Sequence, residues 1–211
     1  MRVVLASNNA KKLAELRALF AALPVELVPQ NELGITEAEE PHVTFVENAL
    51  AKARHAARAC GAAAIADDSG LCVDALGGAP GVASAHFASV ERQAGEREAH
   101  RALQDAANNR LLLERLHAFQ AASERRASFV STLVAVRHAE DPEPLIAFGR
   151  WSGEILFAPR GSGGFGYDPL MFITALGRSV AELDAEAKNA VSHRALAARE
   201  MALLMRTRWL R

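Results

Sequence analysis

The chain has 211 residues, half of them hydrophobic, which is enough to bury a full core without disulfides or structural metals. Its formal charge is −1, and the absence of a basic stripe argues against a nucleic-acid partner. Two cysteines lack metal-type spacing, and no apolar run approaches the ~20 residues of a bilayer span, so we expect a soluble, cytoplasmic protein with no membrane partner.

The first sixty residues predict two strands and two helices. Residues 2–6 have the composition of a buried strand, and the apolar spacing over residues 12–23 predicts an amphipathic helix. Residues 25–28 predict a second strand. A capping box at Thr44 then opens an alanine-rich helix that runs to Cys60.

A small polar loop joins the first strand to the first helix. The residues of this junction are Ser7, Asn8, Asn9, Ala10, Lys11 and Lys12. Free backbone N–H groups and the positive end of a helix dipole make such a loop a candidate anion site, to which Lys12 adds a charge. The alternative is an ordinary helix cap beside a solvated lysine.

An apolar run at residues 62–66 ends in two adjacent carboxylates, Asp67 and Asp68, followed by Ser69 and Gly70. This pattern predicts a buried strand that stops at the cluster and carries it to the rim of a sheet. Because adjacent carboxylates repel each other, we expect a cation, a donor or water against them. The alternative is a turn between two strands.

The rest of the chain predicts, in order, a polar helical stretch at about residues 90–126, a hairpin of residues 129–136 and 145–157, a glycine-rich loop, a short helix over residues 179–188, and a last helix that begins near residue 192. This order is typical of an α/β protein with a mixed sheet. We find no linker that would separate domains, so residues 1–211 are expected to form one domain.

Two segments of this second half carry candidate binding residues. The glycines at residues 161–166 free the backbone to approach a ligand, and Phe165 and Tyr167 offer flat faces, unless these aromatics dock on the core. His193 and Arg194 lie at a helix N-terminus, where cations are misplaced. A bound anion or a base carbonyl would relieve this strain, and the alternative is that both face solvent.

The chemistry of these constellations is complementary. Lysines, an arginine and N–H groups suit a polyphosphate, the aspartates suit Mg²⁺ and an activated water, and the aromatics suit a stacked base. Together they indicate a small-molecule nucleoside triphosphate as the ligand.

Five motifs also occur in the order of a known family: Ser7-Asn8-Asn9-x-x-Lys12, residues 65–71, residues 76–81, residues 164–169, and Lys188-x-x-x-Ser192-His193-Arg194. They resemble the non-canonical purine NTP pyrophosphatases, the inosine/xanthosine triphosphate pyrophosphatase (HAM1-like) family. The resemblance implies an elongated central mixed β-sheet flanked by helices, two lobes with the active-site cleft between them, and a homodimer. It also implies Mg²⁺-dependent hydrolysis of ITP, dITP or XTP to the monophosphate and pyrophosphate, which clears the nucleotide pool.

The same resemblance assigns roles to residues. Asp68 becomes the proton acceptor and a metal ligand, with Asp67 as the alternative for orienting water, and Glu40 becomes the second metal ligand, with Glu39 as its alternative. The implied substrate contacts are Ser7, Asn8, Asn9, Ala10, Lys11, Lys12, Ser69, Phe165, Gly166, Tyr167, Asp168, Lys188, His193 and Arg194. Two other functions stay open: a Maf-like pyrophosphatase acting on dTTP, UTP or modified pyrimidine nucleotides, and a nucleotide-binding module without turnover.

Overall fold

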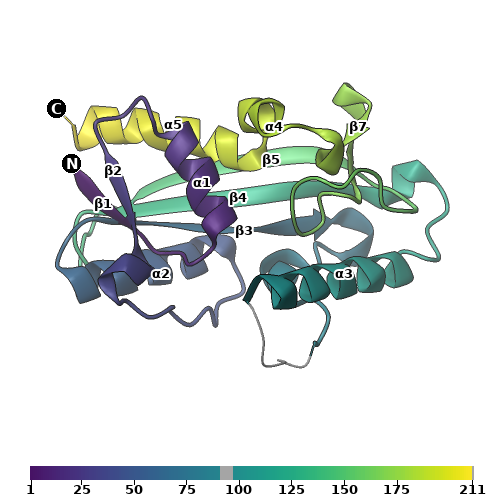
Figure 1. Cartoon of the computed structure of the whole chain (residues 1–211), viewed down its shortest axis with the longest axis horizontal. Coiled ribbons are helices and arrows are strands. Elements are labelled where there is room, and N and C mark those ends of the chain that lie inside the picture. Colours follow the sequence, from purple (N-terminus) through teal and green to yellow (C-terminus); the bar gives the residue numbers. More distant parts are fainter. Residues whose placement is uncertain (91–96, 211) are drawn as a thin grey trace. The chain divides into compact units, whose positions relative to one another are not determined.

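The computed structural model describes residues 1–90 and 97–210, and its strands form a seven-stranded mixed sheet of order β2-β1-β3-β4-β5-β6-β7 (Figure 1). The strands are β1 (Arg2–Leu5), β2 (Glu26–Pro29), β3 (Ala64–Val73), β4 (Arg126–Val136), β5 (Leu145–Ile155), β6 (Met171–Ile173) and β7 (Arg178–Ser179). The α-helices are α1 (Ala10–Leu19), α2 (Phe45–Cys60), α3 (Arg97–Arg115), α4 (Ala185–Val191) and α5 (His193–Arg208). The predicted α/β class with a mixed sheet is confirmed.

Both kinds of strand pairing occur. β1 is parallel to β2 and to β3, whereas β6 is antiparallel to β5 and to β7. The two strands of the predicted hairpin, β4 and β5, are neighbours in the sheet and are joined by residues 137–144. A connection of this length is too short for a parallel crossover, so the pair is antiparallel as predicted.

The chain divides into two compact units. Unit 1 comprises residues 1–69, 130–150 and 189–211, and unit 2 comprises residues 70–129 and 151–188. β3, β4 and β5 each have one end in either unit. The expectation of a single domain stays a prediction.

In unit 1 the strands are buried on both faces, because alternate residues belong to two different apolar cores. Val3 and Leu5 of β1 pack in a core with α1 and α5, whereas Val4 and its neighbour Ala6 pack in a core with α2. Figure 1 shows α1 and α5 on one side of β1 and α2 on the other. Each strand of this unit therefore presents successive side chains to different helices.

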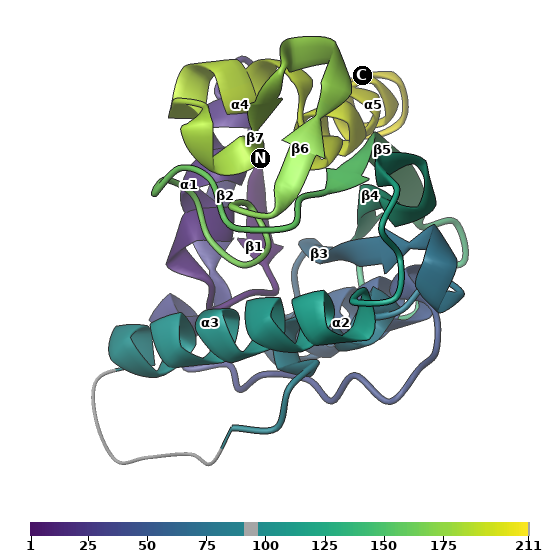
Figure 2. The same cartoon turned by 90° about the vertical axis from the view of Figure 1, so that its right-hand side faces the viewer.

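Unit 2 has its own apolar core. Leu112 and Leu116 of α3 pack there with Phe129 of β4 and Ile155 of β5. The short strands β6 and β7 lie side by side at the end of the sheet (Figure 2). Leu112 and Leu116 are one turn apart, which is the spacing that buries one face of an amphipathic helix.

The strand that carries the two aspartates differs from its prediction. β3 does not stop at Ala66 but runs through the polar cluster to Val73, so the cluster lies inside a strand rather than after one. The physical reason is that Leu71 and Val73, both fully buried, resume the two-residue alternation of apolar side chains. The alternative, a turn between two strands at Asp67 and Asp68, is wrong.

Two helix boundaries also differ. The first helix begins at Ala10 rather than at residue 12, because Asn9 provides the cap. The capping box of Ser179 and Glu182 closes a 3₁₀ turn, and the helix that contains Lys188 begins only at residue 185. Of the predicted helical stretch at residues 90–126, residues 91–96 lie outside the described residues. Thr44 caps α2 as predicted.

Among the described helices, none is long and apolar enough to cross a bilayer.

Candidate functional site

The two adjacent aspartates of β3 point to opposite faces of the sheet, because successive side chains of a strand alternate. Asp67 lies on the same face as Ser69, whose hydroxyl donates to it at 2.9 Å. This face belongs to α1 and α5. Asp68 faces α2, where it pairs with Lys52. The two carboxylates therefore have different partners. Their mutual repulsion is reduced because they point to opposite faces of the sheet and because each one is paired with cations.

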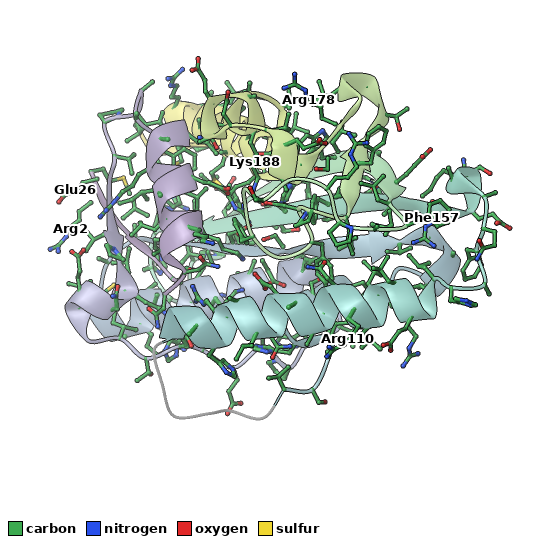
Figure 3. The ribbon with its side chains drawn as sticks, turned by 45° about the vertical axis from the view of Figure 1, so that its right-hand side comes forward. Arg2, Glu26, Arg110, Phe157, Arg178 and Lys188 are labelled. Atoms are coloured by element: carbon green, nitrogen blue, oxygen red, sulfur yellow. The ribbon has the colours of Figure 1, made fainter. Side chains whose placement is uncertain are left out.

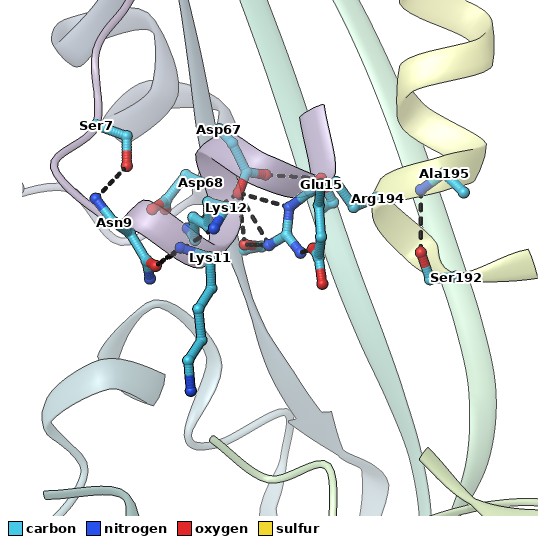
Figure 4. Close-up of polar contacts among 12 residues, drawn as sticks. Ser7, Asn9, Lys11, Lys12, Glu15, Asp67, Asp68, Ser192, Arg194 and Ala195 are labelled. Carbon is cyan, nitrogen blue, oxygen red and sulfur yellow. Dashed lines mark hydrogen bonds and ion pairs between the residues drawn. The ribbon is translucent and has the colours of Figure 1, made fainter. Parts of the chain in front are cut away.

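The carboxylate of Asp67 is saturated with hydrogen bonds (Figure 4). Its Oδ1 accepts from Ser131 Oγ at 2.7 Å, and its Oδ2 accepts from Ser69 Oγ at 2.9 Å. Lys12 Nζ lies 2.9 Å from Oδ2, and Arg194 donates to Oδ2 from Nε at 3.2 Å and Nη2 at 3.0 Å. Burial alone would raise the pKa of Asp67, but the two cations and the Ser131 hydroxyl lower it well below its usual value. Asp67 is therefore ionised and poorly suited to accept a proton.

Arg194 lies in the first turn of α5, just after the N-cap Ser192. Besides Asp67, its guanidinium pairs with Glu15 of α1 and donates to Ser69 Oγ at 2.9 Å. Burial would lower the pKa of Arg194, but the charges of Asp67 and Glu15 raise it. The anions that balance this cation at a helix N-terminus are thus side chains of the protein, and the alternative in which His193 and Arg194 face solvent is wrong, because both are buried.

Asp68 has a different environment. Lys52 Nζ donates to Asp68 Oδ1 at 2.7 Å, to Glu40 Oε1 at 3.2 Å and to the backbone carbonyl of Asp67 at 3.1 Å. The other oxygen of Asp68, Oδ2, is buried and has no hydrogen-bond partner among residues 1–90 and 97–210. Burial raises the pKa of Asp68 against the opposing charge of Lys52. Of the two aspartates, Asp68 is the one with an oxygen available for a proton or a metal ion.

Glu40 reaches the same ammonium group as Asp68. Its side chain is partly exposed, and Lys52 Nζ lies between the two carboxylates. Burial would lower the pKa of Lys52, but the charges of Asp68 and Glu40 raise it, so it stays protonated. Glu39, the alternative candidate, is exposed and has no ion pair within the described part of the chain. The structure thus places Glu40, not Glu39, beside Asp68.

The loop before α1 differs in part from its expected form. The Asn9 side chain accepts hydrogen bonds from the backbone N–H groups of Lys11 at 3.1 Å and Lys12 at 3.3 Å. Two of the donors that were expected to be free for an anion are therefore used by a cap. Ser7 and Asn8 each accept a hydrogen bond within unit 1. Ala10 opens the helix, and Figure 4 shows the Lys11 side chain directed away from the aspartates.

In unit 2 the glycine-rich segment forms a second polar cluster. Lys188 Nζ donates to Asp168 Oδ2 at 2.9 Å and lies 4.6 Å from the centroid of the Phe165 ring. The backbone N–H of Phe165 also donates to Asp168 Oδ2, at 3.0 Å. Gly164 has a φ of +75°, and a Cβ there would lie 2.1 Å from that same oxygen. Figure 3 shows Lys188 among the side chains around α4. Phe165, Asp168 and Lys188, which were expected to contact substrate, thus lie together in unit 2.

Tyr167 does not offer a face to a ligand. Its ring is 5% exposed and packs in the core of unit 2, and its Oη donates to the Ser84 carbonyl at 2.9 Å. Burial, and then the charge of Asp105, raise the pKa of Tyr167. The prediction that both aromatics present flat faces is therefore wrong for Tyr167, and the alternative that it docks on the core is correct.

Three residues of the unit 1 cluster were missed from sequence. Lys52 lies three residues after Ala49 on the buried face of α2, so a lone lysine within an alanine stripe was the available signal. Glu15 follows Lys12 by three residues, which places the two on neighbouring positions of α1. Ser131 is a fully buried polar residue inside β4, a strand in which most residues are buried.

The fold and the site together define an α/β protein in which adjacent aspartates of one buried strand organise cations from α1, α2 and α5. The model of the Ham1 family matches residues 3–203. The chain belongs to this family.

Known relatives cover the whole chain. A dITP/XTP pyrophosphatase from Methylibium petroleiphilum is 75% identical over 210 residues, covering 100% of both chains. One from Leptothrix cholodnii is 65% identical over 212 residues, covering 99% of each. Among solved structures, a HAM1 protein from Coxiella burnetii has a TM-score of 0.86 and 42% sequence identity, covering 98% of this chain and 99% of that one.

Proposed function

We propose that this enzyme is a nucleoside triphosphate pyrophosphatase that hydrolyses ITP, dITP and XTP to the monophosphate and pyrophosphate, and so clears these nucleotides from the pool. Two full-length relatives, 75% and 65% identical, carry the name dITP/XTP pyrophosphatase. The observation that carries the proposal is the unequal environment of the two aspartates, because one buried carboxylate oxygen of Asp68 has no hydrogen-bond partner in the described part of the chain.

Asp68 is the proton acceptor in this proposal. The oxygen of an attacking water bonds to the α-phosphorus, the bond from that phosphorus to the oxygen bridging to the β-phosphate breaks, and pyrophosphate leaves with the bonding electron pair. The water's proton passes to Asp68 Oδ2, the oxygen without a hydrogen-bond partner in the described residues. Burial raises the pKa of Asp68, which makes its carboxylate a stronger base than an exposed one.

The residues around Asp68 fit a magnesium ion. Mg²⁺ in phosphate-transfer sites is commonly held by one or two carboxylates, with phosphate oxygens and water completing the octahedron. Asp68 Oδ1 and Glu40 Oε1 already share one cation, the Lys52 ammonium group, so the metal ion would be held through these two carboxylates while Asp68 Oδ2 takes the proton. No cluster of three or more His, Cys, Asp or Glu that could hold a metal is found in residues 1–90 and 97–210, so substrate and water would complete the coordination. When bound, Mg²⁺ would neutralise charge on the phosphates and on the leaving pyrophosphate.

The cations of unit 1 are proposed to bind the polyphosphate. A triphosphate carries roughly four negative charges at neutral pH, so several donors are needed to hold it. Lys12 and Lys52 are each paired with an aspartate of β3, and both are mostly buried. The carboxylates keep the lysines in place before the substrate arrives, and the phosphates would add to or replace these pairs.

The glycine-rich segment of unit 2 is proposed to bind the nucleobase. Phe165 supplies an aromatic face, with Lys188 over its ring, and Asp168 holds that lysine. Arg194 is a less suitable base-binding residue than its sequence position indicated, since it already makes four hydrogen bonds to Asp67, Glu15 and Ser69. A protein donor to the 6-carbonyl would favour hypoxanthine and xanthine over adenine.

A panel of triphosphates tests the proposed function. With Mg²⁺ present, pyrophosphate release from ITP, dITP and XTP is expected to exceed release from ATP, GTP, dTTP and UTP, and omission of Mg²⁺ should abolish it. Fastest release from a pyrimidine nucleotide would support the Maf-like alternative. Tight ITP binding without product would support a binding module. The homodimer and the cytoplasmic location stay predictions.

A further inference from the structure

One helix of unit 2 holds both backbone polar groups of Gly166. Asp105 Oδ2 accepts a hydrogen bond from the Gly166 N–H at 2.8 Å, and Asn109 Nδ2 donates to the Gly166 carbonyl at 2.9 Å. Asp105 and Asn109 are four residues apart on α3, so they share one face of the helix. Arg110, the next residue, is exposed and points away from the strands (Figure 3).

Asp105 and Asn109 together form a clamp on Gly166. Gly166 lies between Phe165 and Asp168, the two residues of this segment on which the base-binding proposal depends. Gly166 has a φ of +61°, a conformation that residues with a Cβ rarely adopt. Phe165 precedes it, and Asp168 follows two residues later with its bond to Lys188. A peptide held on both sides fixes the direction of the chain on either side of it.

The helix is itself fastened to the core of unit 2. Asn108, between the two clamp residues, accepts from the Ala88 N–H at 2.8 Å and donates to the carbonyls of Ser84 and Ala85, both at 3.2 Å. The Tyr167 hydroxyl donates to the same Ser84 carbonyl at 2.9 Å. The glycine-rich segment and α3 are therefore both hydrogen-bonded to the Ser84 carbonyl. We infer that α3 holds the segment in a fixed position.

We propose that Asp105 and Asn109 are positioning residues that hold the nucleobase-binding segment through Gly166, and so set the affinity for the nucleoside part of the substrate but not for its pyrophosphate part. This inference rests on the proposed function. Neither residue is assigned a contact with substrate. Small displacements of a binding segment weaken binding strongly, because its groups must meet the ligand within fractions of an ångström.

Four variants test the clamp. Asp105→Ala removes the acceptor, Asp105→Asn keeps an oxygen that can accept the N–H bond, and Asn109→Ala removes the neutral half of the clamp. Glu114→Ala, which removes an exposed carboxylate of the same helix, is the matched control. For each variant we would measure KM and kcat for ITP with Mg²⁺, and the inhibition constants of IMP and of pyrophosphate.

Asp105→Ala loses a hydrogen bond to a charged group, so KM and the IMP inhibition constant should rise roughly tenfold. Asn109→Ala loses a neutral hydrogen bond, so both constants should rise about threefold. The pyrophosphate inhibition constant should stay within about twofold in every variant. Asp105→Asn, which keeps a weaker neutral acceptor, should lie between Asp105→Ala and the unmodified chain, and Glu114→Ala should resemble the unmodified chain. Equal weakening of IMP and pyrophosphate would overturn the proposal, as would no change in either.

Amide hydrogen exchange separates failure of the clamp from failure of the proposed function. Gly166 N–H should exchange faster in Asp105→Ala than in the unmodified chain, and unchanged exchange would show that Asp105 does not hold it. If the unmodified chain releases no pyrophosphate from any triphosphate, the proposed function fails and the role in nucleoside affinity fails with it, whatever the exchange shows.

Discussion

Asp67→Asn should destabilise the protein more than any other single change in the unit 1 cluster. The substitution keeps the size of the side chain but removes the charge that Lys12 and Arg194 share. Asp67 is 1% exposed and accepts five hydrogen bonds, including one from Ser131. After the change, two cations would face a neutral amide, with only Glu15 left to balance Arg194.

The magnitude follows from burial. Removing one partner of a buried ion pair costs about 3–5 kcal/mol, because the remaining charge is left uncompensated in a poorly polar environment. A natural domain has about 5–15 kcal/mol of stability in total, so Asp67→Asn should remove a large share of it. Ser131→Ala, which removes one hydrogen bond to the same carboxylate, should cost about 1.5–3 kcal/mol.

Urea denaturation at pH 7 without nucleotide measures both changes. A double variant, Asp67→Asn with Lys12→Met, identifies the cause: if the excess positive charge is responsible, removing Lys12 should cost less in the Asp67→Asn background than in the unmodified chain, with a coupling of about 1–3 kcal/mol. A loss below about 1 kcal/mol in Asp67→Asn, or strict additivity in the double variant, would refute the reasoning.

Other predictions concern single positions. Lys52→Met removes the cation between two carboxylates, so it should lower the melting temperature in Mg²⁺-free buffer. Added MgCl₂ should then raise the melting temperature of this variant more than that of the unmodified chain. Hydrogen bonds from a neighbouring arginine hold the pKa of Asp141 below its usual value, so its contribution is present above about pH 4 and is lost as the pH falls further; Asp141→Asn should lower the urea midpoint at pH 7 and lower it less at pH 3. Gly164→Ala should raise KM for ITP roughly tenfold, because its Cβ would lie 2.1 Å from Asp168 Oδ2, whereas Gly166→Ala, with a similar φ but nothing within 4 Å of the added Cβ, should cost only about 1 kcal/mol of stability.

Much of the fold was readable because local signals agreed with tertiary packing. The Thr44 cap and the apolar stripe of α2 marked that helix to within a residue. The apolar composition of residues 2–6 also predicted a buried strand, and Val3, Val4 and Leu5 of β1 are buried. β3 was mistaken for a strand that stops, because two aspartates, a serine and a glycine are typical of turns. The buried Leu71 and Val73 beyond them were the signal for a continuous strand.

The sequence named candidate residues for the site but did not show that the two aspartates have different partners. Sequence placed Asp67 and Asp68 side by side and left their roles open. The structure separates them, since a continuous strand directs one toward α1 and α5 and the other toward α2. The counter-cation of Asp68 comes from Lys52, sixteen residues earlier, and a contact of that range depends on helix-to-strand packing that no local pattern specifies.

The role of Asp68 as proton acceptor is tested most directly by the turnover of Asp68→Asn. The amide keeps the size of the side chain but cannot take up a proton at neutral pH, so kcat for ITP at saturating Mg²⁺ should fall by about 10²–10⁴. ITP binding should change far less, because Lys12, Lys52 and the glycine-rich segment are unaltered. A kcat within a few-fold of the unmodified chain would contradict the assignment of the reaction to Asp68.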